Sequence, residues 1–242
     1  MAAHELRTPV QPIIGLADTL YSKAQDTPQK EVLEVIFRNT RRLQRLVEDI
    51  LNVTKIESDS LNLKRERFNL EEVIGDAIND TNDSKEFQFS SSSRRKRVQI
   101  VFDGTVRTKH DNGVIVAADK GRIYQIISNL LSNAVKFTQE GVITVSVNTR
   151  RTIGNGNGKV RQQEEVIVLV KDTGIGIHPE VLSRLFSKFA SKSFEGTRLG
   201  LFISKKIIEA HGGKIWAENN CDNDRENAKG ATFGFSLPLF LI

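Results

Sequence analysis

Hydrophobic residues recur at helical spacing twice within the first 57 residues of the chain. The first set is Leu6, Val10, Ile13, Ala17 and Leu20, and the second is Ile36, Leu43, Leu46, Ile50 and Val53. Steps of three and four place each set on one face of a helix. The short polar segment from Gln25 to Pro28 separates them. We therefore predict two amphipathic helices folded back as an antiparallel hairpin.

A hairpin of two helices cannot enclose a core by itself, so its apolar seam needs a partner. The second helix carries charged residues between its apolar positions, among them Arg41, Arg45 and Glu48, as helices of coiled coils and bundles do. A four-helix bundle made by two copies of the chain is the solution we expect. Packing of the seam against the rest of the same chain is the alternative, and periodicity leaves it open.

After about residue 67 the pattern changes to short apolar runs alternating with helical segments. The runs expected to be strands are VQIVF, VIVAA, GVITVSV, EEVIVLVKD, KIWAE and ATFGFSL, with helices near 70–81, 119–137 and 199–211. These elements predict an α+β fold, in which helices cover one face of a mixed, largely antiparallel sheet. Loops are expected at 90–97, 154–158 and 221–230. We place the domains at 1–66 and 67–242.

Composition narrows the class of protein. The chain has 35 Lys plus Arg against 30 Asp plus Glu, and this modest excess favours anionic ligands without indicating a nucleic-acid binder. The basic run from Arg94 to Arg97 is expected to be a solvated loop. The single cysteine, Cys221, cannot form an intramolecular disulfide, which favours a reducing compartment. With no apolar run near the roughly 20 residues that span a bilayer and no signal peptide, we expect a soluble, cytoplasmic chain without a membrane segment.

The first helix carries a candidate phosphoryl acceptor. His4, Thr8, Gln11 and Gly15 share a face that is distinct from the apolar seam, so His4 is expected to point outward. A neutral imidazole is a competent nucleophile, and the adjacent Glu5 could orient the ring or take its proton. The alternative is an ordinary surface histidine beside a carboxylate that the helix dipole favours.

Polar residues form a stripe on the predicted helix at 121–137, including Asn129, Asn133 and Lys136. Asparagine is a poor helix former, so two of them four residues apart call for an explanation. An amide oxygen suits Mg²⁺, and Lys136 one turn later could neutralise phosphate charge. A solvated polar face is the alternative.

Two glycine-containing loops could border a ligand. Asp172-Thr173-Gly174-Ile175-Gly176-Ile177 follows an apolar strand, where a carboxylate at the strand end can accept a hydrogen bond from an exocyclic amine. Gly196-Thr197-Arg198-Leu199-Gly200 leads into a helix whose first amides can bind phosphate. Between them, residues 185–192 mix apolar and cationic side chains, as a nucleotide lid or a plain amphipathic loop would. Ordinary turns after strands also look like the first loop.

Taken in order, these motifs resemble those of the sensor histidine kinases of two-component systems. The segment from His4 to Pro9 resembles the H box, Asn129 to Phe137 the N box, and Asp172 to Ile177 the G1 box. Leu185 to Phe189 resembles the F box, and Gly196 to Leu201 the G2 box. The resemblance extends over nearly the whole chain.

The resemblance implies a hairpin that dimerises and carries phosphate, followed by an ATP-binding domain of the Bergerat type shared with gyrases and heat-shock chaperones. It implies an autokinase that uses ATP and Mg²⁺ to phosphorylate His4 and passes the phosphoryl group to an aspartate of a response-regulator receiver domain. Glu5 would be the acid–base partner of His4, and Thr8 would help to dephosphorylate the receiver. The implied homodimer forms through the hairpin.

For the nucleotide, the resemblance implies that Asn129 binds Mg²⁺ while Asn133 and Lys136 contact the phosphates. Phe137 would lie near the nucleotide, and Asp172 would accept from the adenine amine. The glycine loops complete the cofactor-binding set with Gly174, Gly176, Gly196, Thr197, Arg198, Leu199 and Gly200.

Two features depart from the family pattern. Arg198 stands where such kinases usually carry glycine, so the loop either loses flexibility or gains a guanidinium that reaches phosphate. The chain also begins only three residues before His4. Two other functions remain open. One is a catalytically weakened, nucleotide-binding dimeric scaffold that docks a receiver, and the other is a Bergerat-fold ATPase without phosphotransfer, for which the H box would be accidental.

Overall fold

The structure is a computed structural model, and it divides into two compact units. One unit comprises Met1–Leu61 and Lys188–Ile203, and the other comprises Asn62–Ser187 and Ser204–Ile242. The residues that it describes are 12, 13, 15, 16, 19, 20, 27–58, 61–83, 97–104, 113–156, 159–188, 199–220 and 230–239.

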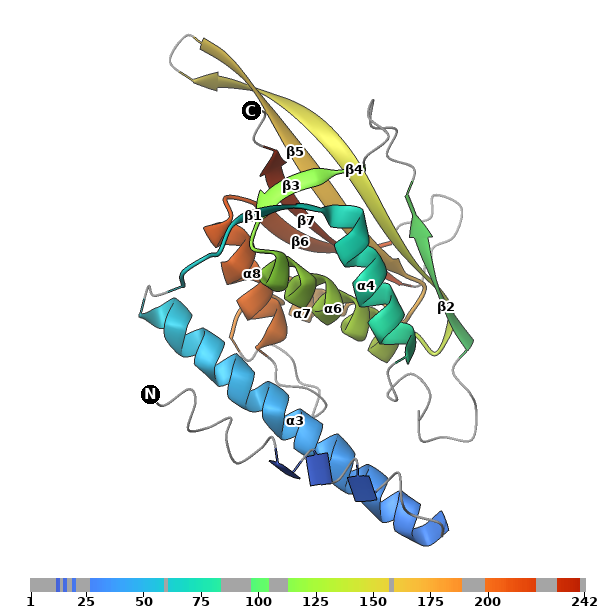
Figure 1. Ribbon diagram of the computed structural model, residues 1–242. Helices are drawn as coiled ribbons and strands as arrows, with labels where there is room; N and C mark the ends of the chain where they lie inside the picture. Colours follow the sequence, from blue (N-terminus) through green and yellow to red (C-terminus); the bar gives the residue numbers. More distant parts are fainter. Residues whose placement is uncertain are drawn as a thin grey trace. The chain divides into compact units, whose positions relative to one another are not determined.

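The first unit is built on the long helix α3, Thr27–Glu57 (Figure 1). The predicted linker from Gln25 to Pro28 is wrong at its end, since Thr27 and Pro28 already belong to the helix. A proline is tolerated there because the first amides of a helix have no intrahelical acceptor. The turn that would close the predicted hairpin lies outside the described residues.

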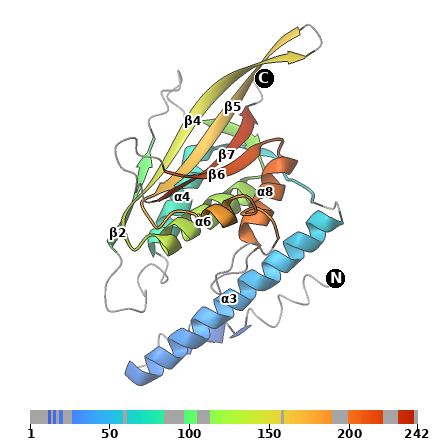
Figure 2. The same ribbon diagram turned by 180° about the vertical axis from the view of Figure 1, so that it is seen from behind.

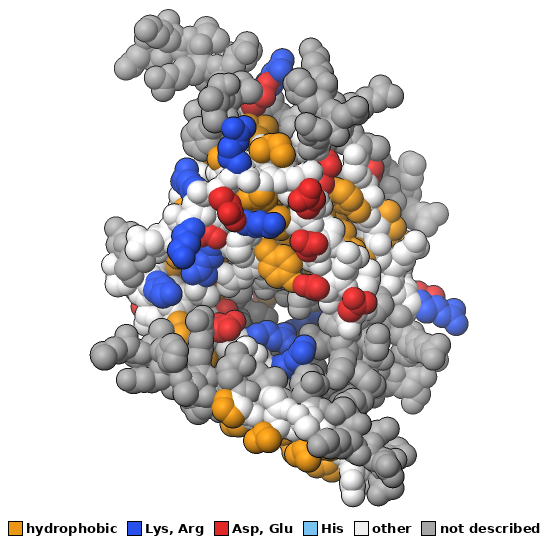
Figure 3. All heavy atoms as spheres, in the orientation of Figure 1, with side chains coloured by type: hydrophobic (Ala, Val, Ile, Leu, Met, Phe, Trp, Pro, Cys, Tyr) orange, Lys and Arg blue, Asp and Glu red, His pale blue; other side chains and the backbone are white. Residues whose placement is uncertain are grey.

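An apolar stripe runs along α3. Ile36, Leu43 and Ile50 follow one another at steps of seven, and their exposed fractions are 43%, 46% and 50%. Val32, one turn before Ile36, is 61% exposed. Figure 3 shows hydrophobic side chains in a row along this helix. A repeat of seven is the spacing of a coiled-coil seam, so this face is suited to a helical partner.

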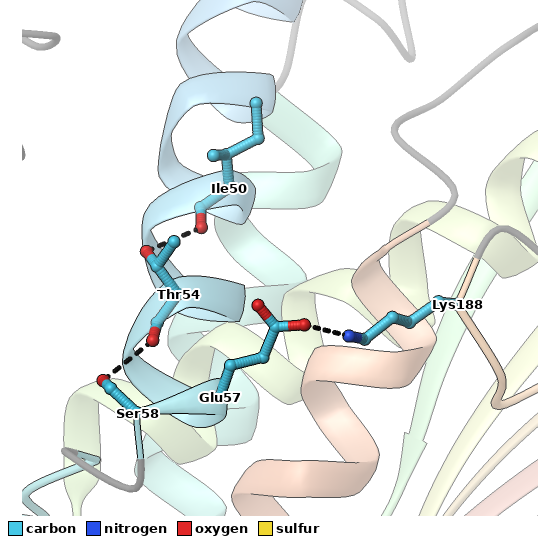
Figure 4. Close-up of polar contacts among 5 residues, drawn as sticks. All are labelled: Ile50, Thr54, Glu57, Ser58 and Lys188. Atoms are coloured by element: carbon cyan, nitrogen blue, oxygen red, sulfur yellow. Dashed lines mark hydrogen bonds and ion pairs between the residues drawn. The ribbon is translucent and has the colours of Figure 1, made fainter.

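The last turns of α3 end in a set of hydroxyl and charged contacts (Figure 4). The Thr54 hydroxyl donates to the Ile50 carbonyl oxygen at 3.0 Å, and the Ser58 hydroxyl donates to the Thr54 carbonyl oxygen at 2.9 Å. Both bonds add a side-chain donor to a backbone carbonyl in the last turns of the helix. Glu57 pairs with Lys188, whose ammonium lies 5.3 Å from the centroid of the Phe202 ring. Because the paired side chains are exposed, the ion pair contributes little to stability.

The second unit contains a five-stranded sheet in the order β2-β4-β5-β7-β6. Its strands are β2 (Arg97–Asp103), β4 (Glu140–Gly156), β5 (Lys159–Asp172), β7 (Ala231–Leu239) and β6 (Lys214–Asn219). Strand β2 pairs with β4 in parallel, and every other pair in this sheet is antiparallel. The predicted α+β fold with a mixed, largely antiparallel sheet is confirmed.

Helices cover one face of this sheet, as Figures 1 and 2 show from opposite sides. They are α4 (Leu70–Asp83), α6 (Lys120–Phe137) and the part of α8 (Gly200–Ala210) that belongs to this unit. The apolar side chains that α6 turns inward are at most 1% exposed, namely Ile123, Ile126, Ile127, Leu130, Leu131 and Ala134. In β5 the residues Val166, Val168 and Val170 are fully buried, at the alternate positions that a strand turns toward one face.

Two short elements were not predicted. Strand β1 (Glu66–Asn69) pairs with β3 (Ile115–Ala118) in a separate two-stranded sheet. The sequence of β1 shows no alternation of apolar and polar residues, because only one of its four side chains, that of Phe68, is buried. Helix α7 (Pro179–Leu182) is a single turn whose N-terminus is capped by the side chain of His178.

Two loop predictions need correction at their ends. Gly154 to Gly156 belong to strand β4, where Gly154 pairs with Arg161, and Arg97 is the first residue of β2. Glycine and arginine are weak strand formers, but backbone ladder hydrogen bonds extend a strand whatever its side chains are. The rest of the loops predicted at 90–97 and 221–230 lies outside the described residues, apart from Gly230.

His211 joins the end of α8 to the start of α6. Its ring is buried, with Nδ1 2.8 Å from the Ile207 carbonyl oxygen, and Nε2 accepts from the Asp119 backbone N–H at 3.0 Å. Nδ1 must therefore carry the proton and the ring is neutral. Asp119 in turn caps α6 by accepting from the Arg122 N–H at 3.0 Å. Gly212 follows at φ +80°, the left-handed conformation that commonly ends a helix.

Acidification should weaken this junction. Burial lowers the pKa of His211 in the folded protein. Above about pH 6.5 the histidine is neutral in both the folded and the unfolded chain, so its contribution to stability is complete. As the pH falls further, the unfolded chain takes up a proton more readily than the folded one, and this contribution is lost. One proton changes the free energy of unfolding by at most about 1.4 kcal/mol per pH unit. We expect His211→Leu to be less stable than wild type at pH 7.5 but to lose less stability between pH 7.5 and 5.5, as measured by urea unfolding. Parallel pH profiles for the two proteins would contradict this assignment.

Candidate functional site

The site is built around the carboxylate of Asp172, the last residue of β5. The side chain is 3% exposed, and its Oδ1 accepts from the backbone N–H of Gly174 at 2.8 Å and of Ala231 at 3.2 Å. Burial raises the pKa of this carboxyl, and the two backbone donors offset part of the rise. Among the residues that the structure describes, none donates to Oδ2. One carboxylate oxygen is thus available to a ligand that carries an N–H donor.

Gly174 brings the loop after β5 against the end of α6. A Cβ at Gly174 would lie 2.4 Å from the Phe137 carbonyl oxygen, closer than any side chain allows. The next residue, Ile175, donates its N–H to that same carbonyl at 3.3 Å. Phe137 is 37% exposed, and the Lys136 ammonium lies 5.0 Å from the centroid of its ring. The structure therefore brings the predicted residues Phe137, Asp172 and Gly174 together.

The polar stripe of α6 is half-buried at Asn129, Asn133 and Lys136. The Asn129 amide nitrogen donates to the hydroxyl of Ser204, a residue of α8 that is 2% exposed, at 3.1 Å. Because this bond engages the nitrogen, the amide oxygen of Asn129 faces away from Ser204. An amide oxygen on a fixed side chain fits a hard cation such as Mg²⁺.

A second group of residues at this site was missed in the sequence. Asn219 accepts from the Ile177 N–H at 2.6 Å and donates to the Ile177 carbonyl oxygen at 2.8 Å. Asn220 donates to the Asp172 carbonyl oxygen at 2.7 Å and accepts from the Thr232 hydroxyl at 2.6 Å. The one available signal was a pair of consecutive asparagines at a strand end, a position where these residues are common for other reasons.

Other predicted residues lie in the first unit, outside the described residues, or in the loop after Asp172. Leu199 and Gly200 lie at the start of α8 and belong to the first unit. The remaining predicted residues lie outside those described: His4, Glu5, Thr8, Gly196, Thr197 and Arg198. Gly176, with φ +74°, is in the loop after Asp172 as expected. Of the lid predicted at 185–192, the described part, Leu185 to Lys188, is turn and bend.

Two features are absent from the described ranges of the chain. No three His, Cys, Asp or Glu side chains there could hold a metal ion together. No helix in that part of the chain is long and apolar enough to cross a membrane.

Comparison with protein families accounts for this arrangement. Residues 118–241 match the family described as histidine kinase-, DNA gyrase B- and HSP90-like ATPases. Residues 1–59 match the His Kinase A (phospho-acceptor) domain. The chain belongs to the sensor histidine kinases. Most of the residues that match the ATPase family lie in the second unit.

Two curated sensor proteins are similar to the chain along 98% of its length. It is 32% identical to the sensory/regulatory protein RpfC of Xanthomonas campestris pv. campestris and 32% identical to the sensor protein ChvG of Rhizobium meliloti. It covers 30% of RpfC and 39% of ChvG, so it spans well under half of either relative.

Solved histidine kinase structures share the fold. Full-length ShkA, solved in complex with AMPPNP, matches with a TM-score of 0.68 at 24% identity over 100% of this chain and 45% of that one. The catalytic domain of ThkA matches with a TM-score of 0.50 at 30% identity over 73% of this chain and 96% of that one.

The close approach at Gly174 predicts a large effect of a small substitution. Gly174→Ala would force a methyl group against the Phe137 carbonyl, so we expect the free energy of unfolding to fall by about 2–4 kcal/mol. Unfolding of this unit in urea can be followed by the fluorescence of Trp216, the single tryptophan of the chain. Gly75→Ala in α4 is the matched control, because a Cβ there meets nothing within 4 Å. An equal loss of stability in both variants would show that the close approach at Gly174 is not the cause of the loss.

Proposed function

We propose that this chain is an ATP-dependent protein-histidine autokinase, which phosphorylates His4 and passes the phosphoryl group to an aspartate of a response-regulator receiver domain. The observation that carries the proposal is the buried carboxylate of Asp172. Its Oδ1 is held by two backbone amides, while Oδ2 has no donor among the described residues. The matches to a phospho-acceptor domain and to an ATPase domain within one chain support the same reaction.

In the proposed complex, the Asp172 carboxylate accepts a hydrogen bond from the exocyclic amine of adenine. Phe137, the last residue of α6, lies beside the nucleotide, while Asn133 and Lys136, earlier in the helix, face its phosphates. A lysine ammonium there offsets phosphate charge. Gly174 and Gly176 let the backbone approach the base.

Mg²⁺ would be held by the amide oxygen of Asn129 together with the phosphates of the nucleotide. When bound, the ion would neutralise charge that develops on the transferred group. The Ser204 hydroxyl holds the Asn129 amide nitrogen, which supports this use of its oxygen. We further propose that Gly196, Thr197, Arg198, Leu199 and Gly200 also belong to the set of residues that bind the nucleotide.

The proposed phosphotransfer domain is residues 1–66, and the proposed ATP-binding domain is residues 67–242. Within the first, Glu5 serves His4 as acid–base partner, and Thr8 assists dephosphorylation of the receiver. The exposed stripe at Val32, Ile36 and Leu43 supports a homodimer formed through the helices. We also propose that the chain acts in the cytoplasm, where ATP is available. It has no nucleic-acid partner in this proposal.

Two other functions compete with the autokinase. An ATPase of the gyrase or chaperone kind would need no phospho-acceptor domain, yet residues 1–59 match one. A silenced scaffold would keep both domains and bind ATP without transferring phosphate. The match to the acceptor domain disfavours the first competitor, and transfer of phosphate distinguishes the second.

A labelling experiment tests the proposal. With ATP labelled in its γ-phosphate and Mg²⁺, we expect the wild-type chain to acquire label that is stable in alkali and lost in acid, as a phosphohistidine is. His4→Gln should lower the incorporation at least about 100-fold, since no other residue takes over a nucleophile's role. His178→Gln is the control, because His178 is an exposed histidine of the second unit and should keep full labelling. Release of free phosphate without a labelled protein would favour the ATPase, and binding of ATP without either would favour the scaffold.

A further inference from the structure

Two asparagines at the end of β6 lie beside the proposed adenine site without a role in the reaction described above. Asn219 is the last residue of β6 and Asn220 follows it. We infer that both are positioning residues, which hold the backbone of Asp172 and of its loop so that Oδ2 faces the adenine amine. The inference rests on the proposed nucleotide site and adds to it the residues that set its selectivity for an amino-purine.

Asn220 bonds the backbone of Asp172 just beyond the end of the ladder between β5 and β7. The ladder between β5 and β7 stops at the pair Lys171 and Thr232, so Asp172 has no paired residue on β7. There the Asn220 amide nitrogen donates to the Asp172 carbonyl oxygen at 2.7 Å, and the Ala231 N–H donates to the Asp172 carboxylate. The backbone and the side chain of Asp172 are thus fixed by two different donors.

The orientation of the Asn220 amide is determined by its neighbours. A backbone carbonyl oxygen can only accept, so Asn220 must turn its nitrogen toward Asp172. Its oxygen then accepts from the Thr232 hydroxyl at 2.6 Å, and Thr232 is 8% exposed. The backbone N–H of Asn220 donates to the Gly230 carbonyl oxygen at 3.0 Å. All three groups of Asn220 are engaged, which restrains the contact of its amide nitrogen with Asp172.

Asn219 fixes the other end of the loop. Its amide bonds both the N–H and the carbonyl oxygen of Ile177, at 2.6 and 2.8 Å, in the way that a neighbouring strand would. Gly176, just before, has φ +74°, and a Cβ there would lie 3.1 Å from the Asn219 oxygen. The two asparagines therefore hold the first and last residues of the loop from Asp172 to Ile177.

This arrangement matters because Oδ2 has to meet a donor whose position is set by the rest of the nucleotide. A hydrogen bond weakens steeply with misalignment, so a small rotation of Asp172 would remove it. A purine without the exocyclic amine makes no such bond and would not sense the rotation. Loss of the asparagine contacts should consequently lower selectivity between the two purines more than it lowers nucleotide binding in general.

The test compares ATP with purine riboside triphosphate, which lacks the exocyclic amine, by titration calorimetry on the whole chain with Mg²⁺. Asn220→Asp keeps the shape of the side chain but turns an oxygen toward the Asp172 carbonyl. We expect affinity for ATP to fall roughly tenfold and affinity for the analogue to change less than about twofold. Both ligands carry the same triphosphate, so the effect of the added charge on the phosphates cancels in the comparison.

Two further variants complete the test. Asn219→Asp should act in the same direction, and it keeps the inference testable if Asn220→Asp does not fold. Asn148→Asp is the control, because Asn148 is an exposed residue of β4 and the same substitution there should leave both affinities unchanged.

The outcomes separate the inference from the function on which it rests. Equal loss of affinity for both nucleotides, or no loss for either, would overturn the positioning role while wild type still prefers ATP. If wild type does not prefer ATP, or if Asp172→Asn keeps the preference, then the proposed adenine contact itself is wrong and the inference fails with it.

Discussion

The second unit depends on how a buried carboxylate is held at the end of a strand. An ionised carboxylate inside the protein costs free energy, and burial therefore raises the pKa of Asp172. Hydrogen bonds from two backbone N–H groups offset part of that cost. Both donors reach the same oxygen, Oδ1. A carboxylate fixed by one oxygen presents the other in a defined direction, and this asymmetry suits it to the recognition of adenine proposed above.

The surrounding structure preserves that arrangement by close backbone contacts. At Gly174 the loop meets the end of α6 so closely that there is no room for a side chain. Gly230, at φ +118°, lies against Asp172, and a Cβ there would be 2.0 Å from the Asp172 carbonyl oxygen. Asn220 bonds that same carbonyl. Sheet, helix and loop therefore meet at Asp172, and a larger residue at either glycine would displace the carboxylate.

The sequence predicted the elements that have strong periodicity and missed those held by distant contacts. Helix α6 was predictable because its inward positions repeat at steps of three and four. Strand β5 was predictable because a run of aliphatic residues, 166–170, stands just before Lys171 and Asp172. The asparagine contacts were not predictable, since Asn219 and Ile177 are 42 residues apart and neither lies in a periodic pattern. Strand β1 was missed because a strand of four residues with one buried side chain carries no alternation.

The chain combines a helical unit, whose apolar stripe suits a partner helix, with a unit whose buried Asp172 we propose as the acceptor for adenine. The most direct measurement is a crystal structure of the chain with Mg²⁺ and a non-hydrolysable ATP analogue. We predict that Oδ2 of Asp172 lies within about 3.2 Å of the exocyclic nitrogen of adenine, while Oδ1 keeps its bonds to Gly174 and Ala231. An adenine bound elsewhere, or a carboxylate turned away from the base, would contradict the account.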